Sequence, residues 1–579
     1  MTNNIRVFLW LGLGLALYVN YSQWQLDHSL KATPTAAASS NTGVDAPKIS
    51  TPDDIVPQAA QLASGSADGA GSPPVAAAPE GTSPPVEPPS EARQPVRVTT
   101  DVLVLDIDLK GGTLVYAELP GYPIVKGESK PVVLLNQDSA ATSYVLRSGL
   151  AGSKPGDVRP THLVNYASAA PSYSLAAGQQ ELRVPLTWTD GQGVSVTKTY
   201  IFHRSMFTIG LEYSIDNESA APWLAASYMQ ISRVDAKVER SMFKVETLAN
   251  RGPVIWGPKS ATETKNIFRR FDIEEPDEQN FSQNVTDGWL AGMQHHFVTA
   301  VVPDRTKPYA YELRSQGRQY WLTAAGPALS VAPGSTASIE EHLYVGPKLQ
   351  KQMVTLHNEL DRVADYSWLY LIAKPLFWIL QQAHGIVHNW GLAIIIATLL
   401  LKLCFYPLSE KAGRSMARMR ALTPRLKQLQ ETYKEDRSQL GKATMELYRS
   451  EKVNPVAGCL PMLIQAPVFL AFYWVLLESA EMRQAPFLGW INDLSSRDPY
   501  FVLPVLNGIA MWFQQKLNPP PPDPMQAKLF QFMPVIFTVM FALFPAGLVL
   551  YWVTNTGLTI LQQWNINRKI EGEEKLRKR

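Results

Sequence analysis

Residues 393–408 read AIIIATLLLKLCFYPL, a run that is apolar enough to cross a bilayer although it contains a lysine, Lys402. A lysine at the centre of a membrane helix costs roughly 2.5–3.5 kcal/mol on insertion scales, so its presence needs a reason. Lys402 precedes Pro407 by five residues, about 7–8 Å along a helix, and its ammonium group could reach the nearer headgroups. The alternative is a functional charge within the membrane. This stretch alone leaves both interpretations open.

The composition limits the class of protein. A chain of 579 residues is too long for one domain, and its long apolar runs lie in the last third. The net charge of +2 argues against bulk nucleic-acid binding, and we expect no direct sequence-specific nucleic-acid binding. Both cysteines, Cys404 and Cys459, fall in the apolar C-terminal region, and no Cys/His cluster has zinc spacing. We therefore expect no disulfide framework, no metal site and no cofactor.

The N-terminal residues indicate an anchor followed by a tether. Arg6 precedes an apolar run, but no small residues follow at the spacing of a cleavage site. Residues 1–24 are therefore predicted to be an uncleaved signal anchor, with a cleaved signal peptide as the alternative. Twelve prolines fall between Pro34 and Pro95, and no aromatic residue occurs from 25 to 115. Residues 25–95 are predicted to be a disordered Pro/Ala-rich linker.

Residues 96–346 have the pattern of a β domain. The segments LDIDL, SYVLRSGL, GVSVTKTYIF and QYWLTAAGP resemble short strands, and turn signals such as TDGQG separate them. They predict a large β-sandwich in which His295 and His296 lie on a strand and are structural. Residues 347–389 are predicted to form an amphipathic helix, Leu349–Val363, and then an interfacial helix rich in aromatic residues.

The remaining apolar runs predict five membrane spans, six with the N-terminal anchor. They are 390–408 and a four-span remainder within 459–567. That remainder consists of 459–477, 500–513 and the two halves of 529–561, which FPAG separates. The loop 409–458 carries eleven Lys/Arg against six acids, whereas 481–498 carries two against three. By the positive-inside rule, 409–458, the basic tail 568–579 and the N-terminus are cytoplasmic, and the β domain is periplasmic.

The cytoplasmic loop 409–458 is predicted to be a basic helical hairpin. Apolar residues recur at spacings of 3, 3, 4 and 3, as in the seam of a coiled coil. These seam residues are Met416, Met419, Leu422, Leu426 and Leu429. Pro424 is expected to kink the first helix, and KEDRSQLGK turns the chain into the second. The alternative is a loop that only sets the topology.

Several of these stretches carry a resemblance to a known family. DYSWLYLIAKPLF, SMARMRALTPRLKQLQETYKEDRSQL, LYRSEKVNPVAGCLPMLIQAPVFLAFYW, RQAPFLGWINDLSSRDPYF and DPMQAKLFQFMPVIFTVMFALFPAGLVLYW resemble the YidC/Oxa/Alb family of membrane protein insertases. The similarity runs from Asp365 to about Arg568. The β domain agrees in size and position with the family's periplasmic domain, which resembles galactose mutarotases in fold. Sugar chemistry does not follow from that likeness.

The resemblance implies a five-helix bundle around a hydrophilic groove that opens to the cytoplasm and the lipid. Lys402 takes the position of the groove cation, usually an arginine, so the charge is kept and the planar guanidinium is lost. The other polar residues expected in the groove are Thr398, Gln465, Asn507, Thr554, Asn555 and Thr556. Tyr551 and Trp552 are expected to form the surface along which a substrate segment slides.

The function implied is that of a non-enzymatic insertase and chaperone of the bacterial inner membrane. Its expected partners are nascent membrane proteins, lipid, the Sec translocon with its accessory subunits, and the ribosome, which the hairpin and tail would contact. Two alternatives are a small-solute transporter and a membrane-anchored periplasmic carbohydrate-active protein. A transporter usually shows internal repeats, and we find none. A carbohydrate enzyme would need paired carboxylates in a pocket.

Overall fold

The computed structural model describes residues 95–577 except 140, 153–157, 236–250, 260–262, 264, 365, 367–368, 434–435, 452–459 and 518–523. The predicted anchor and almost all of the predicted linker lie outside the described residues. The chain forms two compact units. We call them the β unit, which holds the described residues up to Tyr370 together with Trp474–Ala485, and the helical unit, which holds Leu371–Tyr473 and Pro486–Arg579.

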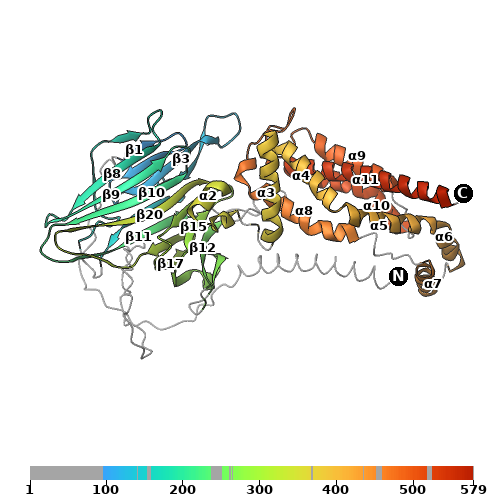
Figure 1. The fold of residues 1–579 in the computed structure, drawn as a ribbon, viewed down its shortest axis with the longest axis horizontal. Helices are drawn as coiled ribbons and strands as arrows, with labels where there is room; N and C mark the ends of the chain where they lie inside the picture. The colour runs from blue at the N-terminus through green and yellow to red at the C-terminus, as the bar shows by residue number, and fades with distance from the viewer. Residues whose placement is uncertain are drawn as a thin grey trace, which may run out of the picture. The chain divides into compact units, whose positions relative to one another are not determined.

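The β unit contains two sheets, one of eleven strands and one of nine (Figure 1). The first comprises β1 (Val96–Thr99), β2 (Val104–Asp108), β3 (Thr113–Pro123), β4 (Pro131–Leu135), β5 (Tyr144–Ala151), β7 (Ser172–Ser174), β11 (Trp223–Val234), β14 (Asn280–Val285), β17 (Tyr309–Gln316), β18 (Gln319–Ala325) and β19 (Leu329–Val331). The second comprises β6 (Ala167–Ser168), β8 (Glu181–Thr189), β9 (Val194–His203), β10 (Thr208–Asn217), β12 (Gly252–Pro258), β13 (Asn266–Arg270), β15 (Trp289–Met293), β16 (Phe297–Val302) and β20 (Ser335–Pro347). A short 3-10 helix, η3 (Pro276–Glu278), precedes β14.

The two sheets share one apolar core, and this confirms the predicted β-rich domain. Burial alternates along β10, so that Leu211, Tyr213 and Ile215 are buried while the residues between them are at least partly exposed. β10 pairs antiparallel with β9 and β20 along its whole length. The turn TDGQG before β9 is closed by the Asp190 carboxylate, which accepts from Val194 N at 3.0 Å.

Two local predictions in the β unit are wrong. His295 and His296 do not lie on a strand but in the turn between β15 and β16, where their rings stack with centroids 3.7 Å apart. A turn lets neighbouring side chains face the same side, which a strand does not. The helix expected over 349–363 is divided into α2 (Gln350–Leu356) and η4 (Leu360–Val363), since His357 is extended and ends α2.

A buried ion pair joins the end of β20 to residue 478. The Lys348 ammonium lies 3.1 Å from a carboxylate oxygen of Glu478, and both side chains are fully buried. Lys348 N also donates to His296 O, and His295 Nε2 lies 3.0 Å from Leu477 O. Residues 474–485 are therefore an integral part of the β unit, although they follow β20 in sequence by more than a hundred residues.

The nearby Glu481 predicts a pH dependence of stability. Its Oε2 is buried with no hydrogen-bond partner among the described residues, while Gln350 N donates to Oε1 at 3.3 Å. Burial raises the pKa of Glu481 from 4.5 to about 7. Because the folded pKa lies above the unfolded one, this contribution to stability is complete below pH 4.5 and is lost as the pH rises to about 7.

We expect the Glu481→Gln protein to lose this part of the pH dependence. The shift corresponds to a change in the free energy of unfolding on the order of 3 kcal/mol across that range. Thermal unfolding of the full chain and of the variant between pH 4.5 and pH 8 measures it. An unchanged difference between the two ends of the range in the variant would contradict the assignment to Glu481.

The helical unit contains most of the helices. They are α3 (Tyr370–Val387), α4 (Trp390–Cys404), α5 (Tyr406–Ala421), α6 (Thr423–Thr432), α7 (Arg437–Ser450), α8 (Leu460–Glu478), α9 (Val502–Leu517), α10 (Pro524–Phe541) and α11 (Ala546–Arg577), with the short η7 (Ala480–Met482) after α8. The first residue of α3 and the last residues of α8, with η7, are counted in the β unit. Within the described ranges, no single helix has both the length and the hydropathy of a membrane span, but Trp390–Cys404 and Tyr406–Ser415 meet the test as a pair bent by 60°.

The break between α4 and α5 divides the run that was expected to be continuous over 390–408. Pro407 has no N–H to donate to the carbonyl of Leu403, and its ring would clash with that carbonyl in a continuous helix. α4 therefore ends at Cys404, two residues after Lys402. At its other end, the Asn389 side chain accepts from Leu392 N at 3.0 Å and caps the helix. The break gives Lys402 a place in the last turn of α4.

The final apolar run forms two helices, as the FPAG stretch predicts. α10 ends at Phe541 and α11 begins at Ala546. The connection is held by backbone hydrogen bonds from Ala546 N to Ser496 O at 2.7 Å and from Gly547 N to Leu494 O at 2.9 Å. The basic tail continues α11 as far as Arg577.

The described residues of the predicted hairpin include α6 and α7, which pack together at one end of the helical unit (Figure 1). The helix is interrupted at Leu422, two residues before Pro424. α5 and α6 are therefore two separate helices and not one kinked helix. Leu422 and Leu426 are buried against Tyr448 of α7, with Met419 partly buried beside them. Arg425 pairs with Glu451 at 2.5 Å. Leu429 is half-buried outside this cluster, and Met416 lies in α5 with a side chain that is not described.

Candidate functional site

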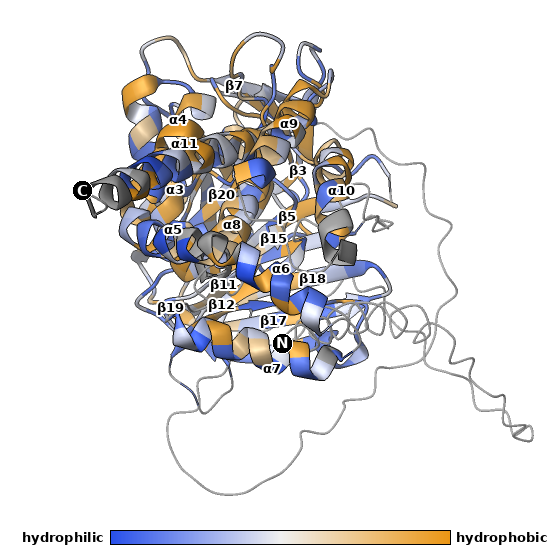
Figure 2. Ribbon diagram, turned by 90° about the vertical axis from the view of Figure 1, so that its right-hand side faces the viewer, coloured by the Kyte–Doolittle hydropathy of each residue, from blue (hydrophilic) through white to orange (hydrophobic). Residues whose placement is uncertain are grey.

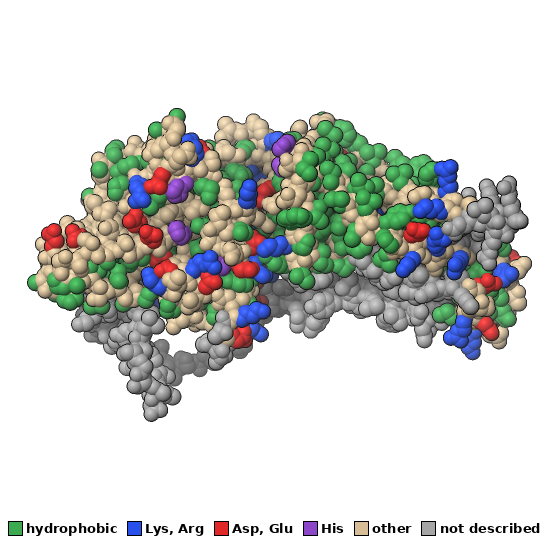
Figure 3. All heavy atoms as spheres, viewed as in Figure 1, with side chains coloured by type: hydrophobic (Ala, Val, Ile, Leu, Met, Phe, Trp, Pro, Cys, Tyr) green, Lys and Arg blue, Asp and Glu red, His purple; other side chains and the backbone are tan. Residues whose placement is uncertain are grey.

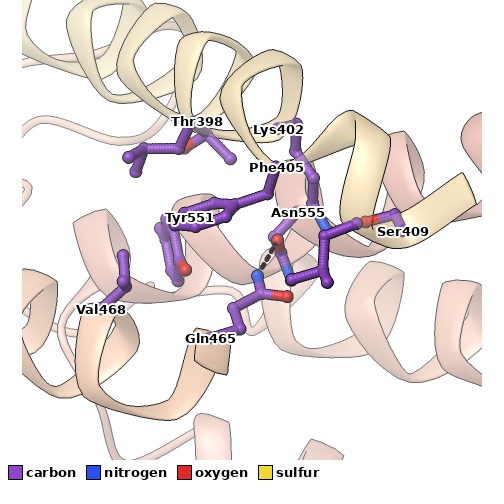
Figure 4. A pocket seen from close by; sticks show the side chains of 10 residues that line it. Thr398, Lys402, Phe405, Ser409, Gln465, Val468, Tyr551 and Asn555 are labelled. Atoms are coloured by element: carbon purple, nitrogen blue, oxygen red, sulfur yellow. Dashed lines mark hydrogen bonds between the residues drawn. The ribbon is translucent and has the colours of Figure 1, made fainter. Parts of the chain in front are cut away.

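A cleft in the helical unit lies between α4, α5, α8 and α11 (Figure 4). It is lined by Thr398, Leu401, Lys402, Phe405, Leu408, Ser409, Gln465, Val468, Tyr551 and Asn555. α4 supplies the cation, α8 the amide of Gln465, and α11 the aromatic and amide groups of Tyr551 and Asn555 (Figure 4). A positive charge and two amides are thus brought together with apolar walls.

The Lys402 ammonium is held by a residue that the sequence analysis did not single out. Lys402 Nζ donates to Thr559 Oγ1 at 2.8 Å, and the same hydroxyl donates to Asn555 O at 2.6 Å. The hydroxyl cannot turn away from Lys402 without losing one of these two bonds. Thr559 therefore fixes where the positive charge lies.

An amide pair extends this polar chain across the cleft. Gln465 Nε2 donates to Asn555 Oδ1 at 2.5 Å, which joins α8 to α11 (Figure 4). Tyr551, one turn before Asn555, is buried and stacks on Phe472 with ring centroids 4.5 Å apart. The aromatic contact sets the spacing of α8 and α11, and the amide pair sets their register.

The positive charge of Lys402 has no counter-ion in the part of the chain that the structure describes. Its hydrogen bond goes to a neutral hydroxyl, and no described carboxylate lies within 4.0 Å of it. The side chain is half-buried among Leu401, Phe405 and Leu408. Low-dielectric walls strengthen the attraction of such a charge for an anionic group. The cleft can therefore attract a carboxylate electrostatically, without forming or breaking a covalent bond.

The other expected groove residues have different surroundings. Thr398 lines the cleft, but its hydroxyl donates to its own helix at Ile394 O, 2.7 Å away. Asn507 and Thr556 are buried and bond to each other at 3.2 Å, which joins α9 to α11 outside the cleft. Thr554 is half-buried and does not line the cleft. Their positions favour helix packing over contact with Lys402.

Trp552 also lies outside the cleft. Its ring packs against Phe469 and Phe541, with centroids 4.9 and 5.3 Å away. Its indole N–H is buried with no hydrogen-bond partner among the described residues. It thus continues the aromatic contact between α8, α10 and α11.

A helical spacing could have identified Thr559. Tyr551, Asn555 and Thr559 recur every four residues, so they lie on one face of α11. Thr559 lies one helical turn after Asn555 on this face, so the spacing could have predicted that Thr559 also lies at the groove. Phe405 and Ser409 also line the cleft. They lie at and after the α4–α5 break, and no helical spacing in the sequence predicted their position.

The helical unit exposes large hydrophobic side chains. Figure 2 shows α8 and α9 dominated by hydrophobic residues, and Figure 3 shows such side chains covering much of the visible surface of this unit. On α3, Leu371, Trp378 and Ile386 are 84%, 60% and 79% exposed, while the opposite face is buried. Val535 and Val539 of α10 are 62% and 65% exposed. Large hydrophobic side chains that are exposed together on one helix face indicate contact with lipid or protein.

Comparisons with known proteins agree with these features. The family model described as "60Kd inner membrane protein" matches residues 382–574, and "YidC periplasmic domain" matches residues 95–379. The membrane protein insertase YidC of Pseudomonas fluorescens (strain Pf-5) is 40% identical over 580 residues, which covers 98% of this chain and 99% of that one. That of Marinobacter nauticus is 40% identical over 572 residues, with 98% of each chain covered.

Solved structures are also similar. A crystal structure of an active YidC insertase matches 81% of this chain and 92% of its own, with 18% identity and a TM-score of 0.36. A galactose mutarotase related enzyme from Lactobacillus acidophilus matches 43% of this chain and 97% of its own, with 7% identity and a TM-score of 0.30. The sequence identity with the curated relatives, over almost the whole of both chains, shows that this chain belongs to the YidC family of membrane protein insertases.

Proposed function

We propose that this protein inserts membrane proteins into the bacterial inner membrane by offering their polar segments a shortened path through the bilayer. The observation that carries the mechanism is the half-buried Lys402 in a cleft, bonded to a neutral hydroxyl. Its ammonium attracts acidic residues of the translocating segment. The amides of Gln465 and Asn555 offer hydrogen bonds that replace water. No covalent bond is made or broken, so the protein acts as an insertase and chaperone without enzymatic chemistry.

The topology proposed is six spans with both termini in the cytoplasm and the β unit in the periplasm. Support comes from the eleven Lys/Arg in 409–458 and from the exposed apolar faces of α3 and α10. α9 has 16 residues, shorter than the about 20 that a bilayer of usual thickness requires. Short helices of this kind favour local thinning of the bilayer, which further shortens the polar path.

Partners follow from the same arrangement. Nascent membrane proteins are the substrates, and the emerging apolar segment leaves along the exposed helix faces into lipid. The Sec translocon and its accessory subunits are proposed to deliver part of these substrates. The basic hairpin of α6 and α7 and the basic end of α11 are proposed to contact the ribosome, because both are rich in Lys and Arg and are cytoplasmic in the proposed topology.

Labelling of single cysteines tests the topology. Cysteines placed in the loop 486–498 should react with a membrane-impermeant maleimide added outside spheroplasts. Cysteines at 568–577 should react only after the membrane is opened. The charge of each loop is the reason. External labelling of the tail would contradict the proposal that α10 and α11 are separate spans.

The paired hairpin predicts a defect in substrate capture. Replacing Leu422 and Leu426 by aspartate puts two charges into the cluster around Tyr448, and we expect α6 and α7 to separate. The insertion rate should fall several-fold while the remaining helices stay folded. An exposed pair of substitutions on the same helices, Lys427→Asp and Met445→Asp, is the matched control. Equal insertion rates for the two double variants would contradict a role in substrate capture and would indicate that the hairpin only sets the topology.

A further inference from the structure

The last two residues of α8 and the residues that follow them are bonded to two separate parts of the β unit. We call residues 477–484 the α8 end segment. On one side, Glu478 forms the buried pair with Lys348, and Leu477 O lies 3.0 Å from His295 Nε2. These contacts fix the end of α8 against the end of β20. The position of the α8 end segment is therefore set by the β unit.

On the other side, the α8 end segment bonds to the hairpin between β3 and β4. Arg483 Nη2 donates to Pro123 O at 2.8 Å and to Ile124 O at 3.2 Å. Gln484 Nε2 donates to Pro123 O at 2.8 Å, and Lys126 Nζ donates to Gln484 O at 2.6 Å. Four hydrogen bonds in both directions hold the hairpin beside residues 483 and 484. The hairpin thus keeps a constant distance from the end of α8.

The tip of this hairpin, residues 124–130, presents aliphatic side chains to its surroundings. Ile124 and Val125 are 48% and 51% exposed, although an alternating strand would bury one of two neighbours. The tip is closed by Ile124 N donating to Lys130 O at 2.9 Å, and Gly127 takes a φ of +86° that an L side chain rarely adopts. Exposed Lys126, Glu128 and Lys130 follow the two aliphatic residues within the tip. A tip that combines two exposed aliphatic side chains with two lysines against one glutamate fits an anionic lipid surface.

We infer that the tip of the β3–β4 hairpin contacts the headgroup region of the periplasmic leaflet. The inference rests on the proposed topology, in which α8 leaves the hydrocarbon at Glu478 on the periplasmic side. Residues 483 and 484 follow that point by five and six positions, and the hairpin bonds to both. Ile124 and Val125 are held at the level where an apolar helix ends, and there they bury apolar area among headgroups. The contact fixes the β unit, and with it the end of α8, at a set height above the bilayer.

Lipid quenching of single labels tests this inference in the full-length protein. Cys404 and Cys459 are first replaced by serine, and one cysteine is then introduced by Ile124→Cys, Leu488→Cys or Leu224→Cys. Each variant is labelled with nitrobenzoxadiazole and reconstituted in phosphatidylethanolamine and phosphatidylglycerol vesicles that contain a spin-labelled lipid at headgroup depth. Leu488 lies in the loop after the α8 end segment and is 60% exposed. Its label reports whether the chain next to the α8 end segment reaches the membrane surface. Leu224, 41% exposed on β11, is the matched aliphatic control within the β unit.

We expect blue-shifted and lipid-quenched fluorescence at positions 124 and 488, and solvent-like fluorescence at 224. Quenching at 488 without quenching at 124 would overturn the hairpin contact and leave the topology standing. Solvent-like fluorescence at both 488 and 124 would overturn the placement of the α8 end, and the inference with it. Equal quenching at 124 and 224 would show general adsorption of the β unit and would also overturn a contact specific to the tip. Thermal unfolding of each labelled variant shows that the β unit is folded.

Discussion

Replacing Lys402 by alanine is expected to slow insertion most for substrates whose translocated segment is acidic. A charge pair at 4 Å is worth about 4 kcal/mol at an effective dielectric of 20 and about 1 kcal/mol in water. The loss for one acidic group should therefore lie between about fivefold and about a thousandfold in rate, graded by how much water fills the cleft. Lys402→Arg should be tolerated, and Lys402→Glu should be the most harmful for acidic substrates.

The measurement is insertion into vesicles of one substrate in three forms, with zero, one or three acidic residues in the translocated segment. Lys402→Met keeps the length of the aliphatic stem and removes the ammonium group with its hydrogen bond to Thr559, so it separates the charged group from the packing of the stem. If the lysine only snorkels to the headgroups, alanine and methionine should be harmless for all three forms. Equal insertion of acidic and neutral forms by a normally expressed Lys402→Met protein would contradict the electrostatic mechanism.

Variants of Thr559 belong to the same experiment. Thr559→Val keeps the shape of the side chain and removes the hydroxyl that accepts from Lys402 and donates to Asn555 O. We expect a smaller defect with the same dependence on substrate charge, because the ammonium remains but is no longer held in place. Thr559→Ser should restore the wild-type rate. A defect of Thr559→Val that is the same for neutral substrates would indicate a packing effect instead.

Replacing Lys348 by methionine is expected to give the largest loss of stability in the β unit. The change leaves the Glu478 carboxylate fully buried without its cation. Removal of one partner from a buried ion pair costs about 3–5 kcal/mol, because the remaining charge is not solvated. For a unit of this size we expect Tm to fall on the order of 10 °C.

The double variant Lys348→Met/Glu478→Leu provides the control. It replaces both charges with apolar groups of similar volume, and a buried pair exchanged in this way often leaves stability unchanged or raised. We therefore expect it to recover most of the lost stability. Thermal unfolding of the three full-length proteins, followed by near-ultraviolet circular dichroism, measures the difference. A double variant as unstable as Lys348→Met would show that the lysine stem, and not the charge pair, stabilises the joint between β20 and α8.

Local sequence patterns were sufficient to predict the elements that depend on neighbours in the chain. Alternating residues identified β2, because one buried face requires a period of two. Short strand-like segments between turn signals identified β5, β9 and β18. The FPAG stretch predicted the turn between α10 and α11 for a similar local reason. The seam of the cytoplasmic hairpin was recognised from its spacing, and Leu422 and Leu426 are indeed buried against α7. Lys402 stood out because a charge within an apolar run is costly wherever the helix lies.

Pairings between distant residues were decided by the tertiary structure. Lys402 meets Thr559 across 157 positions, and Lys348 meets Glu478 across 130. Neither partner has a local pattern that identifies the other, since a side-chain pair between elements depends on how those elements pack. The same reason places Asn507 against Thr556 and outside the cleft, although both are polar residues within apolar helices. A period along one helix shows which residues share a face, but the packing of α4, α8, α9 and α11 determines which of those faces meet.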